Sequence, residues 1–157
     1  MSKPVWIALV LATGIAALGQ QPAKPLPPKV VFVCEHGSAK SVIAAAEFER
    51  MAKERGVAVQ VVSRGTNPDA EIGPAIRQGL HADGIDVGAA AKPIKVSAKD
   101  LEGAAKVVSF GPDLAERLPK GAKAADWSAT PSPGKDYRAA RDYIVKRMES
   151  LLAELPK

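Results

Sequence analysis

Short apolar runs alternate with segments of helical periodicity along the chain, beginning near residue 30. The first run, Val30 to Val33, is continuously β-branched or aromatic, which is typical of a strand buried on both faces of a parallel sheet. The same criteria predict further strands at 57–63 and 106–110 and a short one at 122–127.

Helical spacing of apolar residues predicts helices over 41–55, 70–83 and 135–155. A capping serine, Ser97, marks another helix start, and 113–118 is expected to form a short helical turn. Because neighbouring parallel strands need a crossover that a helix supplies, this alternation predicts an α/β domain of three layers, in which helices flank a four-stranded parallel sheet. Ligands of such sheets bind beyond the carboxyl ends of the strands.

The segment before residue 30 has a different character. Lys3 precedes an apolar stretch ending in Ala17-Leu18-Gly19, which is typical of a signal peptide, here residues 1–19. An uncleaved membrane anchor is the alternative, although the stretch is shorter than the ~20 residues of a usual span. Residues 20–29 contain four prolines and predict an extended linker. Residues 30–157 would then form the domain of a periplasmic or secreted protein, with no stable membrane span after cleavage.

The composition and the net charge of the chain exclude some classes of function. At 157 residues, one domain is expected, and the net charge of +5 is spread along the chain without the basic stripe of a nucleic-acid-binding protein. Cys34 is the only cysteine, which excludes an intrachain disulfide and a cysteine-based zinc site. The two histidines are far apart in the sequence, so no metal site is predicted.

The cysteine lies in a loop directly after the first predicted strand. Residues 34–41, CEHGSAKS, are small and polar, with a cation at the start of a helix. Backbone N–H groups of such a loop, together with the helix dipole, can hold a phosphate-sized oxyanion. The same field favours the thiolate form of Cys34, a nucleophile for phosphorus or arsenic, and Ser41 is placed to donate to its sulfur. An inert cysteine buried behind a strand is the alternative that spacing leaves open.

These residues resemble the active-site loop of the low-molecular-weight protein tyrosine phosphatase family and of the thiol-coupled arsenate reductases related to it. The family signature is a cysteine, five residues, an arginine and a serine. Cys34 and Ser41 match it, Lys40 stands at the arginine position, and His36 matches the reductase form of the loop. Segments 63–66, 84–87 and 137–144 also resemble family segments. The resemblance implies the family's fold for nearly all of residues 30–155.

Two departures weaken the implied activity. Lysine is a point charge, which cannot reproduce the two bonds of an arginine fork to the transferring group. The family's general acid is an aspartate before proline in a late loop, where residues 126–133 read DWSATPSP with threonine or serine at the matching place. Losing an acid catalyst costs ~10²- to 10⁴-fold in rate. Asp126 and Asp136 are candidates from shifted positions, with Asp126 the first choice.

The resemblance therefore implies a cysteine-dependent phosphatase or arsenate reductase, acting on a phosphate monoester of the phosphotyrosine type or on arsenate. No cofactor is expected, and arsenate reduction would need an external thiol because the chain has no second cysteine. The predicted catalytic residues are Cys34, Lys40 and Ser41, and the predicted oxyanion-binding residues are Glu35, His36, Gly37, Ser38, Ala39 and Lys40.

Other interpretations remain open at this level. A degenerate member would bind phosphate-like anions or a phosphorylated partner without turnover, and a structural interaction module would do neither. The side chain of Glu35 is expected to point outward, because a carboxylate beside a bound anion repels it. His36 is expected either to hydrogen-bond the oxyanion or to brace the loop. Arg64 is expected either to add positive charge near the mouth of the site or, as the more common outcome, to be a solvated surface arginine.

Overall fold

The central layer of the molecule is a four-stranded, entirely parallel sheet in the order β2-β1-β3-β4. A computed structural model describes residues 25–156, so the predicted signal peptide and residues 20–24 of the predicted linker lie outside the described residues. The strands are β1 (Lys29–Cys34), β2 (Gln60–Gly65), β3 (Lys106–Ser109) and β4 (Ala125–Asp126). The four-stranded parallel sheet predicted from the alternation of the elements is confirmed.

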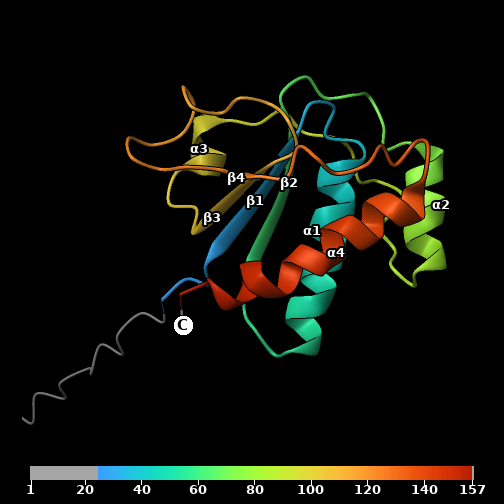
Figure 1. Ribbon diagram of the computed structural model, residues 1–157, viewed down its shortest axis with the longest axis horizontal. Helices are drawn as coiled ribbons and strands as arrows, with labels where there is room; N and C mark the ends of the chain where they lie inside the picture. The colour runs from blue at the N-terminus through green and yellow to red at the C-terminus, as the bar shows by residue number, and fades with distance from the viewer. Residues whose placement is uncertain (1–24, 157) are drawn as a thin grey trace, which may run out of the picture.

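Helices cover both faces of this sheet. They are α1 (Lys40–Glu54), α2 (Pro74–Ala82), α3 (Ala98–Leu101) and α4 (Tyr137–Ala153). Figure 1 shows α1, α2 and α4 together on one face, with the short α3 on the other. The three-layer architecture is therefore confirmed, with one thick and one thin helical layer. Among the described residues, no helix has the length and apolar character needed to cross a membrane.

The alternation of β1 side chains divides the hydrophobic core in two. Phe32, fully buried, packs on the thick side, where its ring meets that of Phe48 from α1 at a centroid distance of 5.7 Å. Val31 and Val33 point to the thin side and pack with Leu101 of α3. A strand with both faces buried is the arrangement that the continuous apolar run of residues 30–33 predicts.

Several element boundaries differ from prediction because pairing and proline decide them. The predicted strand over 57–63 begins only at Gln60, whose register partner Lys29 is the first residue of β1. The predicted helix over 70–83 begins at Pro74, which lacks an N–H and fits the first helical position. The predicted strand over 122–127 shortens to β4, which pairs only with Val108 and Ser109 at the end of β3.

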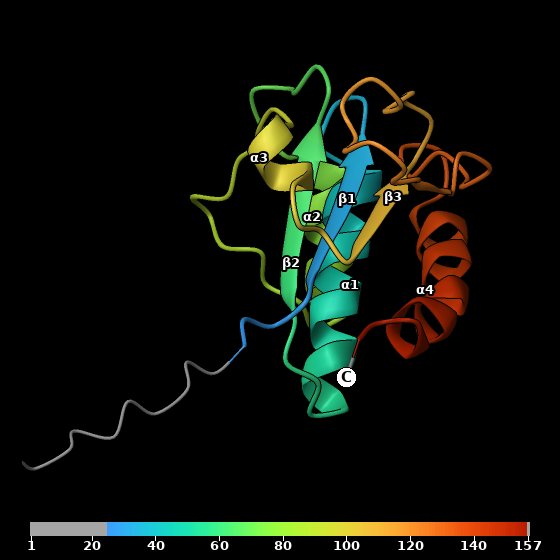
Figure 2. The same cartoon turned by 90° about the vertical axis from the view of Figure 1, so that its left-hand side faces the viewer.

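The strand order determines where loops gather. The chain leaves β1 toward β2 on one side and later returns to β3 on the other, so the strand order reverses beside β1. Figures 1 and 2 show the loop after β1 at the carboxyl edge of the sheet, next to the loop after β2. In open α/β sheets this reversal point is where ligands bind.

Candidate active site

Cys34 is the last residue of β1, and its thiol faces the loop that follows. The residue is 6% exposed, and its Sγ lies 3.1 Å from the Gly37 backbone nitrogen, which donates to it. The Ser41 hydroxyl lies 3.1 Å from the same sulfur and accepts a hydrogen bond from Ser63 on β2 over 3.0 Å. Because Ser41 accepts from Ser63, its own proton is free to point at the sulfur. Two donors thus converge on one thiol, as a thiolate requires.

Two glycines allow the loop to curl back over the sulfur. Gly37 has φ of +62°, the left-handed region that favours glycine. Its backbone packs against Gly65 at the end of β2, where an added Cβ would lie 2.7 Å from the Gly37 nitrogen. The loop can therefore take this position only because both residues lack a side chain.

The loop after β2 is joined to the cysteine loop by backbone hydrogen bonds. The N–H groups of Thr66, Asn67 and Asp69 donate to the carbonyl oxygens of Cys34, Glu35 and His36, over 3.1, 2.8 and 3.0 Å. The two loops run side by side at the top of Figure 2. They form one continuous rim around the thiol, which neither loop would form alone.

Charged side chains of both loops meet on this rim. Asp69 accepts a 2.5 Å hydrogen bond from the hydroxyl of the buried Ser38, and its other oxygen lies 3.4 Å from His36 Nδ1. The Nε2 of His36 lies 3.8 Å from the carboxylate of Glu35, whose side chain is 67% exposed. Glu35 therefore points outward as expected, and His36 lies between two carboxylates.

The start of α1 has the features of an anion site. Its N-cap residue, Ala39, offers no side-chain acceptor to the first helical N–H groups. Lys40, the first residue of the helix, is half-buried, and within residues 25–156 no hydrogen bond or ion pair involves its ammonium group. Uncapped N–H groups and a cation in the first turn of the helix favour an oxyanion at this position.

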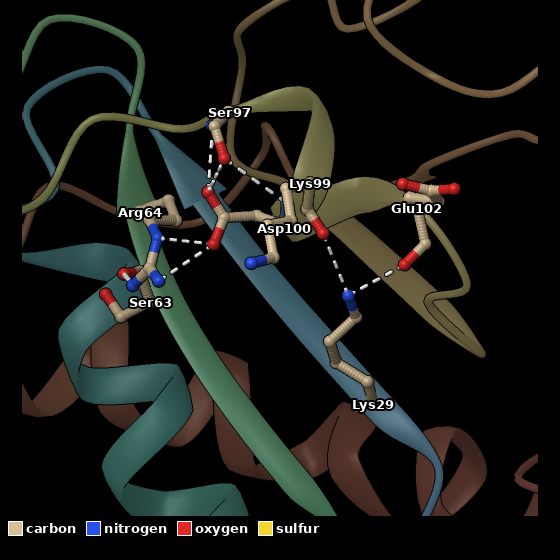
Figure 3. A network of polar contacts seen from close by, with 7 residues as sticks. All are labelled: Lys29, Ser63, Arg64, Ser97, Lys99, Asp100 and Glu102. Atoms are coloured by element: carbon tan, nitrogen blue, oxygen red, sulfur yellow. Dashed lines mark hydrogen bonds and ion pairs between the residues drawn. The ribbon is translucent and has the colours of Figure 1, made fainter.

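Arg64, expected to be solvated, is instead held by an ion pair away from the thiol. Its Nε and Nη2 lie 2.9 and 2.8 Å from Asp100 Oδ1, with side chains only 20% and 14% exposed, and Figure 3 shows the two groups facing each other. Burial opposes ionisation of Asp100, but hydrogen bonds from Arg64 and Ser97 hold the pKa of this carboxyl below its usual value. Arg64 thus ties β2 to α3, and its charge is neutralised there.

Asp126, the candidate general acid, is the last residue of β4, separated from β1 by β3. Its Oδ1 accepts a 2.8 Å hydrogen bond from the Ser128 backbone nitrogen. Hydrogen bonds from Ser128 lower the pKa of Asp126 below its ordinary value. An acid must carry a proton to donate it, so at neutral pH this carboxylate is poorly suited to the task.

The sequence alone did not indicate three residues of this rim. Asp69 follows an Asn-Pro turn and carries no motif, while Ser63 and Gly65 stood out only as part of a family-like segment. An acidic residue directly after the turn that follows a predicted strand was the only available signal. No group of three or more His, Cys, Asp or Glu residues that could hold a metal ion occurs in the part of the chain that the structure describes.

The fold and the loop define the class: an α/β protein with a thiol held at the carboxyl edge of a parallel sheet, at the N-terminus of a helix. The family model for low molecular weight phosphotyrosine protein phosphatase matches residues 29–127. The chain belongs to this family. Its members are cysteine-based enzymes that bind phosphate or arsenate oxyanions.

Solved structures share the fold at low sequence identity. The low molecular weight protein tyrosine phosphatase of Streptococcus pyogenes has a TM-score of 0.70 and 15% identity, covering 83% of this chain and 94% of its own. The thioredoxin-dependent arsenate reductase of Corynebacterium glutamicum has a TM-score of 0.68 and 25% identity over 84% of this chain and 63% of its own.

A third similar structure is the arginine phosphatase of Geobacillus stearothermophilus, with a TM-score of 0.62 and 22% identity over 82% of this chain and 92% of its own. A comparison with curated proteins found none that matches. Phosphatases and reductases therefore share this architecture, and the chemistry of this chain has to be argued from its own residues.

Proposed function

We propose that the protein is exported from the cytoplasm and hydrolyses phosphate monoesters, with Cys34 as the nucleophile. The thiolate attacks phosphorus while the backbone N–H groups of residues 35–40 hold the three non-bridging oxygens. The charge of Lys40 offsets theirs. A water molecule then hydrolyses the phosphocysteine and restores the thiolate.

The observation that carries this proposal is the convergence of two donors on one sulfur. Gly37 N and Ser41 Oγ both lie 3.1 Å from Cys34 Sγ, at the start of a helix with no side-chain cap. An inert core cysteine needs no such donors. A nucleophilic thiolate does, because it is the charged form that attacks.

Phosphate is favoured over arsenate as the reacting group because of the thiol count. Arsenate reduction needs two electrons, which thiols supply by forming a disulfide, and Cys34 is the only cysteine in the chain. Hydrolysis needs no reductant. Arsenate reduction remains open to this site only with an external thiol as the second partner.

The test is hydrolysis of p-nitrophenyl phosphate between pH 5 and 8 by the reduced protein and by Cys34→Ser and Lys40→Arg. We expect turnover by the wild type, none by Cys34→Ser, and faster turnover by Lys40→Arg, because arginine grips two equatorial oxygens where lysine offers a point charge. This substrate has a good leaving group, so a weak acid catalyst does not mask the reaction.

Absence of turnover in all three proteins would overturn the hydrolase proposal. Phosphate affinity that persists in that case would support the degenerate member that binds anions without turnover. Turnover that survives Cys34→Ser would show that another residue is the nucleophile. Arsenate-dependent oxidation of an added thiol, without phosphatase activity, would identify a reductase.

A further inference from the structure

We infer that His36 is the proton donor to the leaving group and that Asp69 is its positioning residue. This inference rests on the proposed hydrolase function and deepens it. The site lacks the aspartate that the family uses for this step, and Asp126 is held as a carboxylate by Ser128. An acid from elsewhere on the rim would fill the same role.

The geometry orients the imidazole for this task. Nδ1 of His36 lies 3.4 Å from Asp69 Oδ1, an ion-pair contact when the ring is protonated. Nε2 is left free, since the nearest carboxylate oxygen, from Glu35, lies 3.8 Å away, beyond hydrogen-bond length. With 53% of its side chain exposed, the ring is open to solvent on the loop that begins at Cys34.

Asp69 is itself fixed on two sides. Its Oδ2 accepts from the buried hydroxyl of Ser38, and its backbone N–H donates to the carbonyl oxygen of His36. The carboxylate therefore cannot turn away from the imidazole without breaking its bond to Ser38, while the backbone bond holds the two loops together. An aspartate held beside a histidine ring in this way can position that ring.

Two carboxylates lie beside the ring of His36. They are Glu35 on its own loop, 3.8 Å from Nε2, and Asp69 on the loop after β2, 3.4 Å from Nδ1. Imidazole as a chemical group can act as an acid at a pH where a free carboxylic acid is already ionised.

The proton and electron balance closes without a co-reactant. As Cys34 Sγ attacks, the S–P bond forms, the bond from phosphorus to the leaving oxygen breaks, and the Nε2 proton passes to that oxygen. The neutral imidazole then takes a proton from the attacking water as the P–S bond breaks. The products are an alcohol, inorganic phosphate, a thiolate and the restored imidazolium.

The experiment compares two substrates that differ in leaving group. Phenyl phosphate needs a proton on its leaving oxygen far more than p-nitrophenyl phosphate does. We expect His36→Gln to lower kcat/KM, which reports the leaving-group step alone, by about 10²-fold or more on phenyl phosphate and much less on p-nitrophenyl phosphate. The matched control is His81→Gln, an exposed histidine of α2 that should change neither rate.

The pH profile tests Asp69 separately. Asp69→Asn keeps an acceptor for Ser38 but removes the negative charge beside Nδ1 of His36. If Asp69 acts through His36, we expect the alkaline limb of the kcat/KM profile on phenyl phosphate to move to lower pH. A merely structural role would lower the rate at every pH without moving the limb.

The failures of the two proposals are distinguishable. If the wild type turns over both substrates and His36→Gln lowers their two kcat/KM values equally, His36 is not the acid, while the hydrolase proposal stands. An unmoved alkaline limb in Asp69→Asn would remove Asp69 from the mechanism. If the wild type hydrolyses neither substrate, the hydrolase proposal falls and this inference with it.

Discussion

At the scale of single residues, the thiol depends on a short chain of hydroxyl groups. Ser63 donates to Ser41 over 3.0 Å, and Ser41 lies 3.1 Å from Cys34 Sγ. Ser41 is fully buried, so no water replaces it when its hydroxyl is removed. The hydroxyl chain connects β2 through α1 to the end of β1.

The Ser41→Ala variant tests this chain. A hydrogen bond to a charged group contributes ~1.5–3 kcal/mol, so we expect a loss of about 10- to 100-fold in kcat with little change in KM. The rate of alkylation of Cys34 by iodoacetamide at neutral pH should fall as well. Ser63→Ala, one bond further from the sulfur, is the graded control and should lose less. Equal alkylation rates in wild type and Ser41→Ala would contradict the role.

At the scale of elements, some of the contacts between loops, strands and helices leave no room for an added side chain. The cysteine loop lies against β2 because Gly65 has no side chain, with the Gly37 nitrogen only 2.7 Å from the position of an added Cβ. On the opposite side of β1, Lys29 Nζ donates to the carbonyl oxygens of Lys99 and Glu102, which ties α3 to the sheet (Figure 3). The site is thus built by contacts between elements.

The Gly65→Ala substitution should therefore damage the site more than the addition of one methyl group would suggest. Overpacking typically costs ~1–3 kcal/mol, and here the clash is with backbone that cannot rotate away. We expect a lower Tm and loss of both phosphate affinity and turnover. Gly73→Ala is the matched control, because its Cβ would meet only the Ile76 side chain at 3.7 Å. Unchanged phosphate affinity in Gly65→Ala would show that the loop does not need this close contact.

Helix α1 also carries a buried carboxylate that makes stability depend on pH. Glu47 is 2% exposed, and within the described residues its Oε1 has no hydrogen-bond partner. Burial raises its pKa above the usual 4.5, although the Arg50 guanidinium opposes this. The folded state therefore holds this proton more tightly than the unfolded state, and the contribution of Glu47 to stability falls as pH rises above about 4.5.

Glu47→Gln removes this titration. We expect the free energy of unfolding of the variant, relative to wild type, to increase between pH 4 and pH 7, whatever the offset at pH 4. Urea unfolding at several pH values measures it. Glu49→Gln, the exposed neighbour on the same helix, is the control and should show a much flatter difference. A difference for Glu47→Gln that is constant with pH would contradict the raised pKa.

At the scale of the whole molecule, an anion bound at the start of α1 should stabilise the fold. A ligand that binds only the folded state adds about 2.7 kcal/mol at 100 times its Kd, which is several degrees in Tm for a protein of this size. Titration with orthophosphate at constant ionic strength should raise Tm accordingly. Lys40→Gln should reduce the rise, because it removes the cation beside the site, whereas Lys123→Gln, remote in the segment before β4, should not. No rise in the wild type would exclude the anion site.

The sequence predicted the helices and strands better than it predicted the residues of the site. The apolar run of residues 30–33, the stripe of α4 and the cap at Ser97 each predicted an element that the structure contains. The predicted starts of β2 and α2 were wrong by several residues. The structure begins β2 at Gln60, where pairing with β1 starts, and α2 at Pro74, because the residue before a proline, here Gly73, disfavours helical backbone. The expectation of a solvated Arg64 was wrong because its partner Asp100 is 36 residues away.

The sequence by itself determined the parallel three-layer fold and the position of the thiol. Both follow from local patterns: the period of apolar residues, and a cysteine between a strand and a helix. Only the tertiary structure decided which residues lie beside the cysteine loop and its first helical turn. Ser63, Gly65 and Asp69 come to this place through parallel pairing of β1 with β2, which places one loop beside the other. Such contacts join residues about thirty positions apart, and no periodicity in the chain records them.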